Sequence, residues 1–397
     1  MNTRQMFYDL EMFIISFGIA TFTLGYTYFL LTIALYLFLR NQNIKFNNSI
    51  ILWFFVVLLS GSFFAFYTVV IDKYNVKYDT DILLRVRFFW IRIIFAFAIL
   101  TYACSLKYEQ LLKFVYYISI PLTITGLFQF FSSPTERVMM LTSEPSAAGM
   151  YYIFLLPLLL IYYRINKKAR FWIILFIITG IFIRSKAQIL VIPFYILYFI
   201  FKTKNKKLKR IIISVITVVI LISPFLLSVN EVNDILHFYE TFKDLGIKGL
   251  REENHIFSSF TTRFSSFLTA IQLFYENPFG IGFGVFHPEY ILRMSSPDFI
   301  QSYMNGVEIS ATLKGVMYGT PKSIFFEYLV CSGLFFLLPL IYYVWKFHKQ
   351  EKSELIKASL YGLLIVSLMV ELAPFITFNI ILLTIFNKKK NELQMSL

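Results

Sequence analysis

Charged side chains border long apolar segments throughout this sequence, and arginines predominate among those expected on the outer side. Those expected at the outer ends of apolar segments or in outer loops are Arg85, Arg87, Arg92, Arg137, Glu144, Arg184, Lys186, Arg251, Arg263, Glu327 and Glu371. The guanidinium group is planar, does not lose its charge, and binds two phosphate oxygens at once. Such arginines beside a membrane cavity suit a substrate with a lipid tail and a phosphate or diphosphate headgroup. Any single one could instead reach lipid headgroups or pair with a carboxylate.

Two residues could act as a general acid or base. Glu144 stands in Glu144-Pro145-Ser146, where Pro145 disfavours helix before it and Ser146 can cap the helix that follows. His287 follows a glycine-rich stretch, and an unperturbed histidine titrates near neutral pH. Either residue could also be an ordinary loop residue, so neither defines a reaction alone.

The glycine-rich stretch reads Asn277-Pro278-Phe279-Gly280-Ile281-Gly282-Phe283-Gly284. Its alternate glycines permit positive φ angles and close approach of another backbone. The stretch does not follow a predicted strand, so it is not a dinucleotide-binding fingerprint.

No metal or other cofactor is predicted. The triplet Asp79-Thr80-Asp81 could chelate a divalent ion, but such triplets are common by chance. Cys104 and Cys331 both lie in apolar stretches, lack the spacing of metal ligands and are not expected to form a disulfide.

The composition indicates an integral membrane protein. Hydrophobic residues make up 58% of the 397 positions and charged residues 15%, whereas about 25% is usual for a soluble domain. The mean hydropathy is +0.67. The formal net charge of +14 comes largely from clusters at 164–170, 202–210 and 388–390. Such clusters beside apolar spans are typical of cytoplasmic anchors, so nucleic acid is not an expected partner.

The apolar segments are expected to be membrane-crossing helices, because lipid offers no partner for a free peptide group. They fall at 12–39, 50–71, 88–105, 111–131, 147–163, 170–184, 187–202, 210–228, 323–346, 355–371 and 373–387. The first could be one long helix or two short ones, so about eleven crossings are expected, or twelve. The predicted fold is an all-α polytopic bundle in which residues 1–397 form a single transmembrane domain.

The basic loops set the topology. If the loops rich in Lys and Arg all lie inside, the chain must turn outside near Arg184-Ser185-Lys186 and again near 371–374. The loops 132–146 and 229–322 then lie outside and the C-terminus is cytoplasmic. Residues Met1 to Glu11 lack the basic region and cleavage site of a removable signal peptide.

The outer loop 229–322 is the one large hydrophilic insertion, and it is expected to be folded. An amphipathic helix is predicted after Thr261-Thr262, which could cap it, and Asn277-Pro278 should end it. Its apolar positions are Phe264, Phe267, Leu268, Ile271, Phe274 and Tyr275. A second such stretch holds Val232, Ile235, Leu236, Tyr239 and Phe242. These helices could roof a cavity at the outer membrane face, or simply pack on each other.

In their order along the chain, these pieces resemble the O-antigen polymerase and ligase superfamily, the Wzy-type membrane polysaccharide polymerases. The resemblance runs from about Arg137 to Gly333. Arg137 with the Glu144-Pro145-Ser146 triplet is similar to the family's Arg…Glu-Pro-Ser, and Ser185-Lys186 stands where relatives usually carry Ser-Arg. The most specific match is Arg263 followed by 277–284, which is similar to Arg…Asn-Pro-x-x-Gly-x-Gly-x-Gly.

The last part of the resemblance is Phe325-Phe326-Glu327…Gly333-Leu334 at the start of a span. Relatives often carry His-Asn just before it, and Lys322 and Ser323 occupy those positions here. The sequence therefore lacks a histidine base at this place.

The resemblance implies a bacterial inner-membrane glycosyltransferase that works without a metal. It would polymerise undecaprenyl-diphosphate-linked oligosaccharide units into a lipopolysaccharide O-antigen or capsule on the outer side of the membrane. A sugar hydroxyl of one unit would attack the anomeric carbon of the growing chain, and undecaprenyl diphosphate would leave. A chain-length regulator and a flippase are the implied protein partners.

The family also implies roles for single residues. Arg263 and Arg137, with Arg251 and Lys186, would hold the diphosphate and neutralise its developing charge. Glu144 is the first candidate for the general base, with His287 second. The remaining candidate site residues are Arg184, Asn277, Pro278, Gly280, Gly282, Gly284 and Glu327.

Three other functions compete with polymerisation. A ligase of the same superfamily would transfer finished chains to another acceptor, and Lys322 in place of histidine mildly favours the polymerase. A flippase or transporter for the lipid-linked sugar predicts internal repeats and only short loops, and the sequence has neither. A metal-dependent lipid-phosphosugar transferase would require Asp79 and Asp81.

Overall fold

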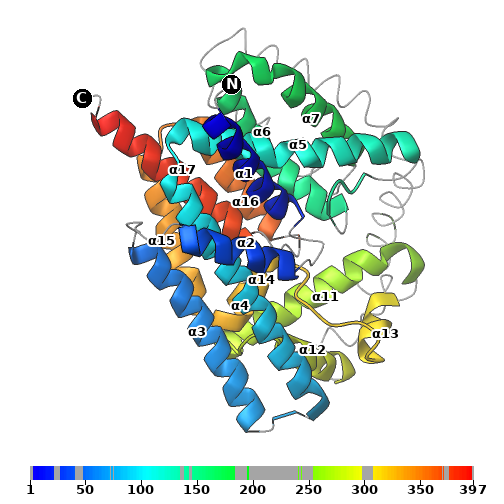
Figure 1. Cartoon of the computed structure of the whole chain (residues 1–397). Helices are drawn as coiled ribbons and strands as arrows, with labels where there is room; N and C mark the ends of the chain where they lie inside the picture. Colours follow the sequence, from blue (N-terminus) through cyan, green and yellow to red (C-terminus); the bar gives the residue numbers. More distant parts are fainter. Residues whose placement is uncertain are drawn as a thin grey trace. The chain divides into compact units, whose positions relative to one another are not determined.

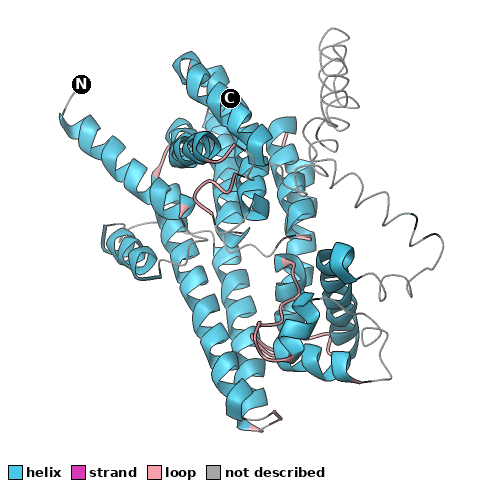
Figure 2. Cartoon of the chain, turned by 90° about the vertical axis from the view of Figure 1, so that its right-hand side faces the viewer, coloured by secondary structure: helices cyan, strands magenta, loops and turns pink. Residues whose placement is uncertain are grey.

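The computed structural model of the chain is built of helices joined by turns and loops (Figures 1 and 2). It describes residues 3–21, 27–40, 48–71, 73–74, 76–134, 138–142, 145–183, 254–296, 307–368 and 375–395, with single positions at 195, 240, 243 and 370. No strand occurs among these residues, which confirms the predicted all-α class for them. The chain divides into two compact units, residues 1–48, 91–212 and 343–397, and residues 49–90 and 213–342.

The first unit is a bundle of helices packed around α5 and α6. Its elements are α1 (Thr3–Ala20), α2 (Thr27–Arg40), the second half of α4 (Val76–Ser105), α5 (Tyr108–Ser132), α6 (Pro145–Ile165), α7 (Arg170–Ile183), the end of α15 (Leu334–Gln350), α16 (Glu354–Ser367) and α17 (Phe375–Met395). Helix α6 packs against α5, α7 and α16, and α5 also contacts α1 and α17.

Hydroxyl groups and small residues join the helices of this unit. Ser359 Oγ donates to the Phe154 carbonyl at 2.8 Å, and Ser16 Oγ donates to the Phe114 carbonyl at 3.3 Å. A Cβ on Gly180 would overlap the Tyr152 ring, so α7 and α6 approach closely there. Contacts of this kind are typical of helices that associate in a membrane, where apolar burial alone does not hold helices together.

Two of the described helices are long and apolar enough to cross a membrane by length and composition, Tyr108–Ser132 and Ala147–Ile165. Shorter apolar helices cover Phe29–Arg40, Phe55–Val70 and Thr377–Phe386. The predicted spans 187–202 and 210–228 lie outside the described residues, apart from position 195. The predicted number of eleven crossings is therefore not confirmed.

Several predicted helix boundaries differ from those in the structure. The span 12–39 is two helices, α1 and α2, which was one of the two predicted alternatives, but α1 begins earlier, at Thr3. The helix of span 88–105 begins at Val76. Helix α6 begins at Pro145, so Ser146 lies inside the helix and is not its cap. Proline suits the first helical position because the N–H it lacks would have no partner there.

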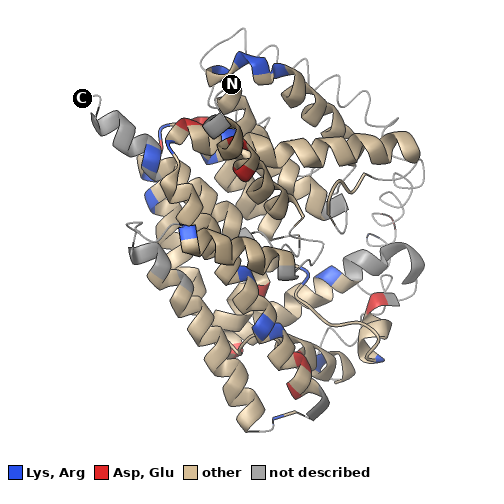
Figure 3. Cartoon of the chain, in the orientation of Figure 1, with Lys and Arg blue, Asp and Glu red and all other residues tan. Residues whose placement is uncertain are grey.

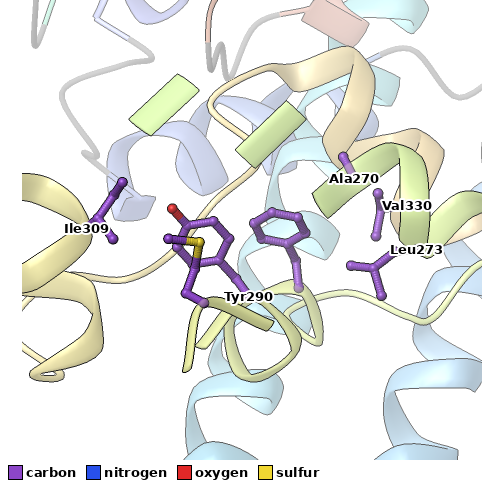
Figure 4. Close-up of a cluster of buried hydrophobic side chains, with 7 residues drawn as sticks. Ala270, Leu273, Tyr290, Ile309 and Val330 are labelled. Carbon is purple, nitrogen blue, oxygen red and sulfur yellow. The ribbon is translucent and has the colours of Figure 1, made fainter. Parts of the chain in front are cut away.

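The second unit contains the α3–α4 hairpin and the folded part of the large loop. Its elements are α3 (Asn48–Val70), the first half of α4, α11 (Asn254–Glu276), α12 (Phe286–Ser295), α13 (Val307–Leu313), α14 (Ile324–Ser332) and the first half of α15. Helix α11 packs on α12, α13 and α14. The core between them consists of Ala270, Leu273, Phe286, Tyr290, Met294, Ile309 and Val330 (Figure 4).

Helix α11 ends at Glu276, directly before Asn277-Pro278 as predicted, but its start and its buried side differ from the prediction. It begins at Asn254, so Thr262 lies within the helix and is not a cap. The fully buried side chains are mainly small, namely Thr262, Ser265, Ser266, Thr269, Ala270 and Leu273. Ile271 and Tyr275, expected on the apolar face, are exposed. The second predicted amphipathic stretch, with Val232 and Phe242, lies outside the described residues.

Helix α3 presents a continuous apolar stripe on its exposed side. The stripe consists of Leu52, Phe55, Leu59, Phe63, Phe66 and Val70. The spacing of three and four residues places them on one side of the helix. No charged residue interrupts α3 (Figure 3). Helix α15 exposes Phe335, Leu338 and Ile341 in the same way.

Candidate functional site

The glycine-rich loop between α11 and α12 is bonded to the break between α14 and α15. The break lies at Gly333, whose φ is +54°, so the span predicted at 323–346 is interrupted. In a continuous helix the carbonyls of Val330 and Cys331 would accept from N–H groups four residues further on. Here they accept instead from Ile281 at 2.9 Å and Gly282 at 3.1 Å. In return, the Leu334 N–H donates to the Pro278 carbonyl at 2.8 Å.

The same loop is also fixed to α3. The Phe283 N–H donates to the Gly61 carbonyl at 2.9 Å, and the Phe283 ring stacks on Phe89 with ring centres 4.1 Å apart. A Cβ on Gly61 would overlap the Phe283 ring. Phe283 is fully buried and anchors the loop to the α3–α4 hairpin.

The three alternate glycines adopt the conformation that the sequence predicts. Gly280, Gly282 and Gly284 have φ angles of +101°, +100° and +85°. A Cβ on Gly280 would lie 2.4 Å from the Cys331 carbonyl oxygen, and one on Gly282 would lie 2.2 Å from the Ala65 backbone nitrogen. Positive φ and close backbone approach are therefore both confirmed, and the motif serves to place α12.

Helix α12 carries a cluster of paired charges. Glu289 accepts hydrogen bonds from Lys73 Nζ at 2.7 Å and from the Tyr74 hydroxyl. Arg293 Nη2 lies 3.7 Å from the second oxygen of Glu289. Arg293 also holds Glu276 at the end of α11 with both terminal nitrogens. The cluster joins α11, α12 and the α3–α4 turn.

The electrostatics of this cluster favour the ionised form of Glu289. Burial alone would raise the pKa of its carboxyl. The hydrogen bonds from Lys73 and Tyr74 and the nearby positive charges outweigh burial, so the pKa lies below its ordinary value. The pKa of the Tyr74 hydroxyl is raised by burial and by the negative charge that it faces.

His287 is buried, with 4% of its surface exposed. Its Nδ1 accepts from the Gly319 N–H at 2.8 Å, and its ring stacks on Tyr318 with centres 4.3 Å apart. Tyr78 of α4 contacts the ring by its edge. Because Nδ1 is an acceptor, the neutral ring carries its proton on Nε2.

Tyr318 connects His287 to the charged groups of α4 and α14. Its hydroxyl donates to the Gly284 carbonyl at 2.7 Å, and the Arg85 guanidinium lies 4.2 Å from its ring centre. Burial raises the pKa of the Tyr318 hydroxyl. Arg85 opposes this rise, and the carboxylates of Glu327 and Asp81 reinforce it. We call Arg85, His287 and Tyr318 the aromatic–arginine cluster.

The structure brings together only some of the predicted site residues. The glycine loop and His287 meet through Tyr318, and the buried Glu327 acts on the same tyrosine. Arg263 is exposed on α11. Asn277 closes α11 by donating its N–H to the Leu273 carbonyl at 2.8 Å. The side chains of Arg137, Glu144, Arg184, Lys186 and Arg251 lie outside the described residues, so their roles stay predictions.

Lys322 and Ser323 stand directly before α14 and serve its start. Ser323 caps the helix by accepting from the Phe326 N–H at 3.2 Å. Lys322 has a φ of +56° and pairs with Glu308 at 3.3 Å.

Asp79 and Asp81 lie within α4, because this helix begins earlier than predicted. Residues two apart on a helix do not face the same side, so they do not form a pair. The part of the chain that the structure describes contains no group of three His, Cys, Asp or Glu side chains placed to hold a metal ion.

Sequence reasoning missed several residues of this region. Glu289 and Arg293 are spaced as neighbours on one helix side, which is a signal that could have been used. Lys73, Tyr74 and Tyr318 stand far from their partners in the sequence and carry no such signal.

The comparisons with known proteins give one relative. The chain is 26% identical over 356 residues to an "Uncharacterized 49.5 kDa protein in cps region" of Klebsiella pneumoniae. The match covers 84% of this chain and 77% of that protein. No family model matches the chain, and no solved structure matches it significantly.

Proposed function

We propose that this chain is a multi-pass membrane protein of surface polysaccharide assembly, and that it polymerises lipid-diphosphate-linked repeat units. The observation that carries the proposal is the similarity, across 84% of the chain, to a protein whose name places it in a cps, or capsule, region. A relationship of this extent includes the apolar helices as well as the large loop, so it favours a common role in capsule synthesis.

The exposed apolar stripes support the placement in a membrane. On α3 the stripe from Leu52 to Val70 runs the length of the helix without a charge. Helix α7 exposes Phe171, Ile174, Ile178 and Ile181 at the same spacing. Contiguous apolar surface of this extent is unusual on soluble proteins, whereas lipid covers it at no cost. The proposed location is a bacterial inner membrane, with the C-terminus in the cytoplasm.

The proposed reaction is polymerisation, which the resemblance to the Wzy-type polymerases implies. An acceptor hydroxyl would attack the anomeric carbon of the growing chain, its proton would pass to a base, and the bond to the diphosphate oxygen would break. Arg263 would neutralise the charge that develops on the leaving diphosphate. Glu144 stays the proposed base and His287 the second candidate, because the Nδ1 of His287 already accepts from the Gly319 N–H.

The test is a gel of surface polysaccharide from the native strain, a deletion strain, and the deletion strain carrying wild type, Arg263→Ala or Lys314→Ala. Lys314 is an exposed cation of the same loop and serves as the matched control. The proposal expects that the deletion leaves single repeat units on the lipid, and that Lys314→Ala restores the ladder of chain lengths while Arg263→Ala does not. Protein levels of both variants are measured by immunoblot.

Other band patterns decide against the proposal. Full-length chains left on the lipid diphosphate indicate a ligase, and repeat units retained on the cytoplasmic side indicate a flippase. An unchanged ladder in the deletion strain would remove the role in polysaccharide assembly altogether.

A further inference from the structure

The glycine loop contacts the middle of α3 and not its end. Helix α3 has 23 residues. At 1.5 Å per residue such a helix is about 34 Å long, close to the thickness of a bilayer's hydrocarbon core. The Phe283 N–H bonds to the carbonyl of Gly61, which lies near the centre of the helix. If α3 crosses the membrane, Phe283 lies at mid-depth.

Helix α14 gives a second and independent measure of depth. It begins at the cap Ser323, and Cys331, which accepts from Gly282, lies eight residues further on. At 1.5 Å per residue, Cys331 therefore lies about 12 Å along the helix axis from Ser323. In addition, Ser332 Oγ donates to the Val57 carbonyl of α3 at 2.9 Å. Both helices therefore place the loop at a similar depth.

The two ends of the loop lie on the same side. Glu276, the last residue before the loop, pairs with Arg293 after it. Glu289, between them, accepts from Lys73 and Tyr74, which follow the end of α3. The predicted topology places the large loop outside. Counting back two predicted spans from the outer loop 132–146 places the α3–α4 turn outside as well. The loop thus enters from the outer side, lies deepest near Phe283, and returns to the outer side.

We propose that residues 277–285 form a re-entrant loop in the outer leaflet, and that it places the aromatic–arginine cluster below the level of the lipid headgroups. Tyr318 bonds to Gly284, so the cluster lies at the depth of the loop. The ligand class that fits this depth is the polar headgroup of a lipid-anchored substrate, which need not leave the bilayer to reach it. The inference rests on the proposed membrane location, but not on the polymerase reaction.

The hydrogen bonds of the loop meet the requirement that a membrane sets. Irregular backbone is tolerated at that depth only when protein or a wet cavity satisfies its polar groups. The N–H groups of Ile281, Gly282 and Phe283 all donate to helix carbonyls. Those of Ile281 and Gly282 go to acceptors that the break at Gly333 releases.

Phe279 and Leu292 provide a matched pair for a test. Their exposed fractions are 55% and 60%, so protein covers them almost equally. Phe279 contacts Phe335 in the apolar stripe of α15, whereas Leu292 lies on α12 beyond Glu289. The loop model therefore places only Phe279 within the hydrocarbon.

The experiment labels Phe279→Cys and Leu292→Cys with a charged, membrane-impermeant maleimide, first in spheroplasts and then in detergent. The native chain, whose two cysteines are Cys104 and Cys331, gives the background. Leu292→Cys should react in both conditions. Phe279→Cys should react roughly tenfold less in spheroplasts, because a charged reagent enters hydrocarbon poorly, and should recover in detergent.

Two results would overturn the inference in different ways. Equal labelling of both cysteines in spheroplasts would remove the re-entrant loop and leave the membrane protein standing. Recovery of the chain from the soluble fraction would remove the membrane placement itself, and the polysaccharide gel would still report on function separately.

Discussion

Lys73 and Glu289 are 216 positions apart in the sequence and form an ion pair of 2.7 Å that joins the α3–α4 turn to α12. The Glu289 side chain is 8% exposed, whereas that of Lys73 is 48% exposed. The carboxylate therefore depends on its partners more than the lysine depends on it. Because Tyr74 binds the same oxygen, the turn supplies two donors to one buried acid.

Loss of Glu289 should destabilise the protein more than loss of Lys73. Glu289→Ala leaves Arg293, Lys73 and Tyr74 without their shared acceptor and should cost about 3 kcal/mol, the usual scale for breaking a buried pair. Lys73→Met should cost about 1 kcal/mol or less, because solvent screens the exposed lysine. Thermal unfolding in detergent, followed by intrinsic fluorescence, measures both. Equal effects would mean that the pair is not buried in the folded protein.

The stability supplied by Glu289 should depend on pH in one direction. Its pKa in the folded state lies below the ordinary value of 4.5, so its contribution is complete above that value and is lost as the pH falls through the lowered pKa. The difference in unfolding temperature between wild type and Glu289→Gln should therefore be large at neutral pH and shrink as the pH falls below 4.5. A difference that grows on acidification would contradict the assigned direction of the pKa shift.

Alanine at Gly282 and at Gly284 should separate backbone strain from steric overlap. Both residues have positive φ, so alanine should cost about 1 to 3 kcal/mol at either position through strain alone. At Gly282 the new Cβ would also lie 2.2 Å from the Ala65 backbone nitrogen of α3. At Gly284 the nearest atom, the Ile82 Cα of α4, would be 2.9 Å away. Gly282→Ala should therefore be the more destabilising, as measured by its yield and its unfolding temperature. Comparable losses would show that strain and not the contact with α3 dominates.

Features of α11 and of the glycine loop that depend on local chemistry could be predicted from the sequence. Asn277-Pro278 ends α11 because proline cannot continue a helix, and alternate glycines indicated positive φ. The predicted start of α11 was wrong because Thr262, read as a possible cap, is a buried residue within the helix. The break at Gly333 was also not predicted, because its apolar neighbours on both sides look like one continuous span.

Contacts between distant segments could not be predicted from spacing. Nothing near Lys73 indicates that Glu289 is its partner, and nothing near Tyr318 indicates the stack with His287. Arg85 was visible only as one of several costly charges, and its place over the Tyr318 ring follows from tertiary packing. For the predicted site residues Arg137, Glu144, Lys186 and Arg251, the sequence argument alone still applies.

His287 offers a prediction that separates a structural role from a role in the reaction. Its Nδ1 accepts from Gly319, and in the neutral ring its Nε2 carries the proton. Asparagine places an oxygen near the position of Nδ1, and glutamine places an amide near that of Nε2. His287→Asn should therefore keep the bond to Gly319 and most of the stability, whereas His287→Gln should lose about 1 kcal/mol or more, because the buried Gly319 N–H loses its acceptor.

If Nε2 donates to substrate, His287→Asn should fold normally and yet shorten or abolish the polysaccharide ladder, while His287→Gln should retain more activity per folded molecule. The measurements are the unfolding temperature and the ladder, normalised to the amount of protein in the membrane. If both variants lose activity only in proportion to lost protein, His287 serves to hold the loop around Gly319 and takes no part in the reaction.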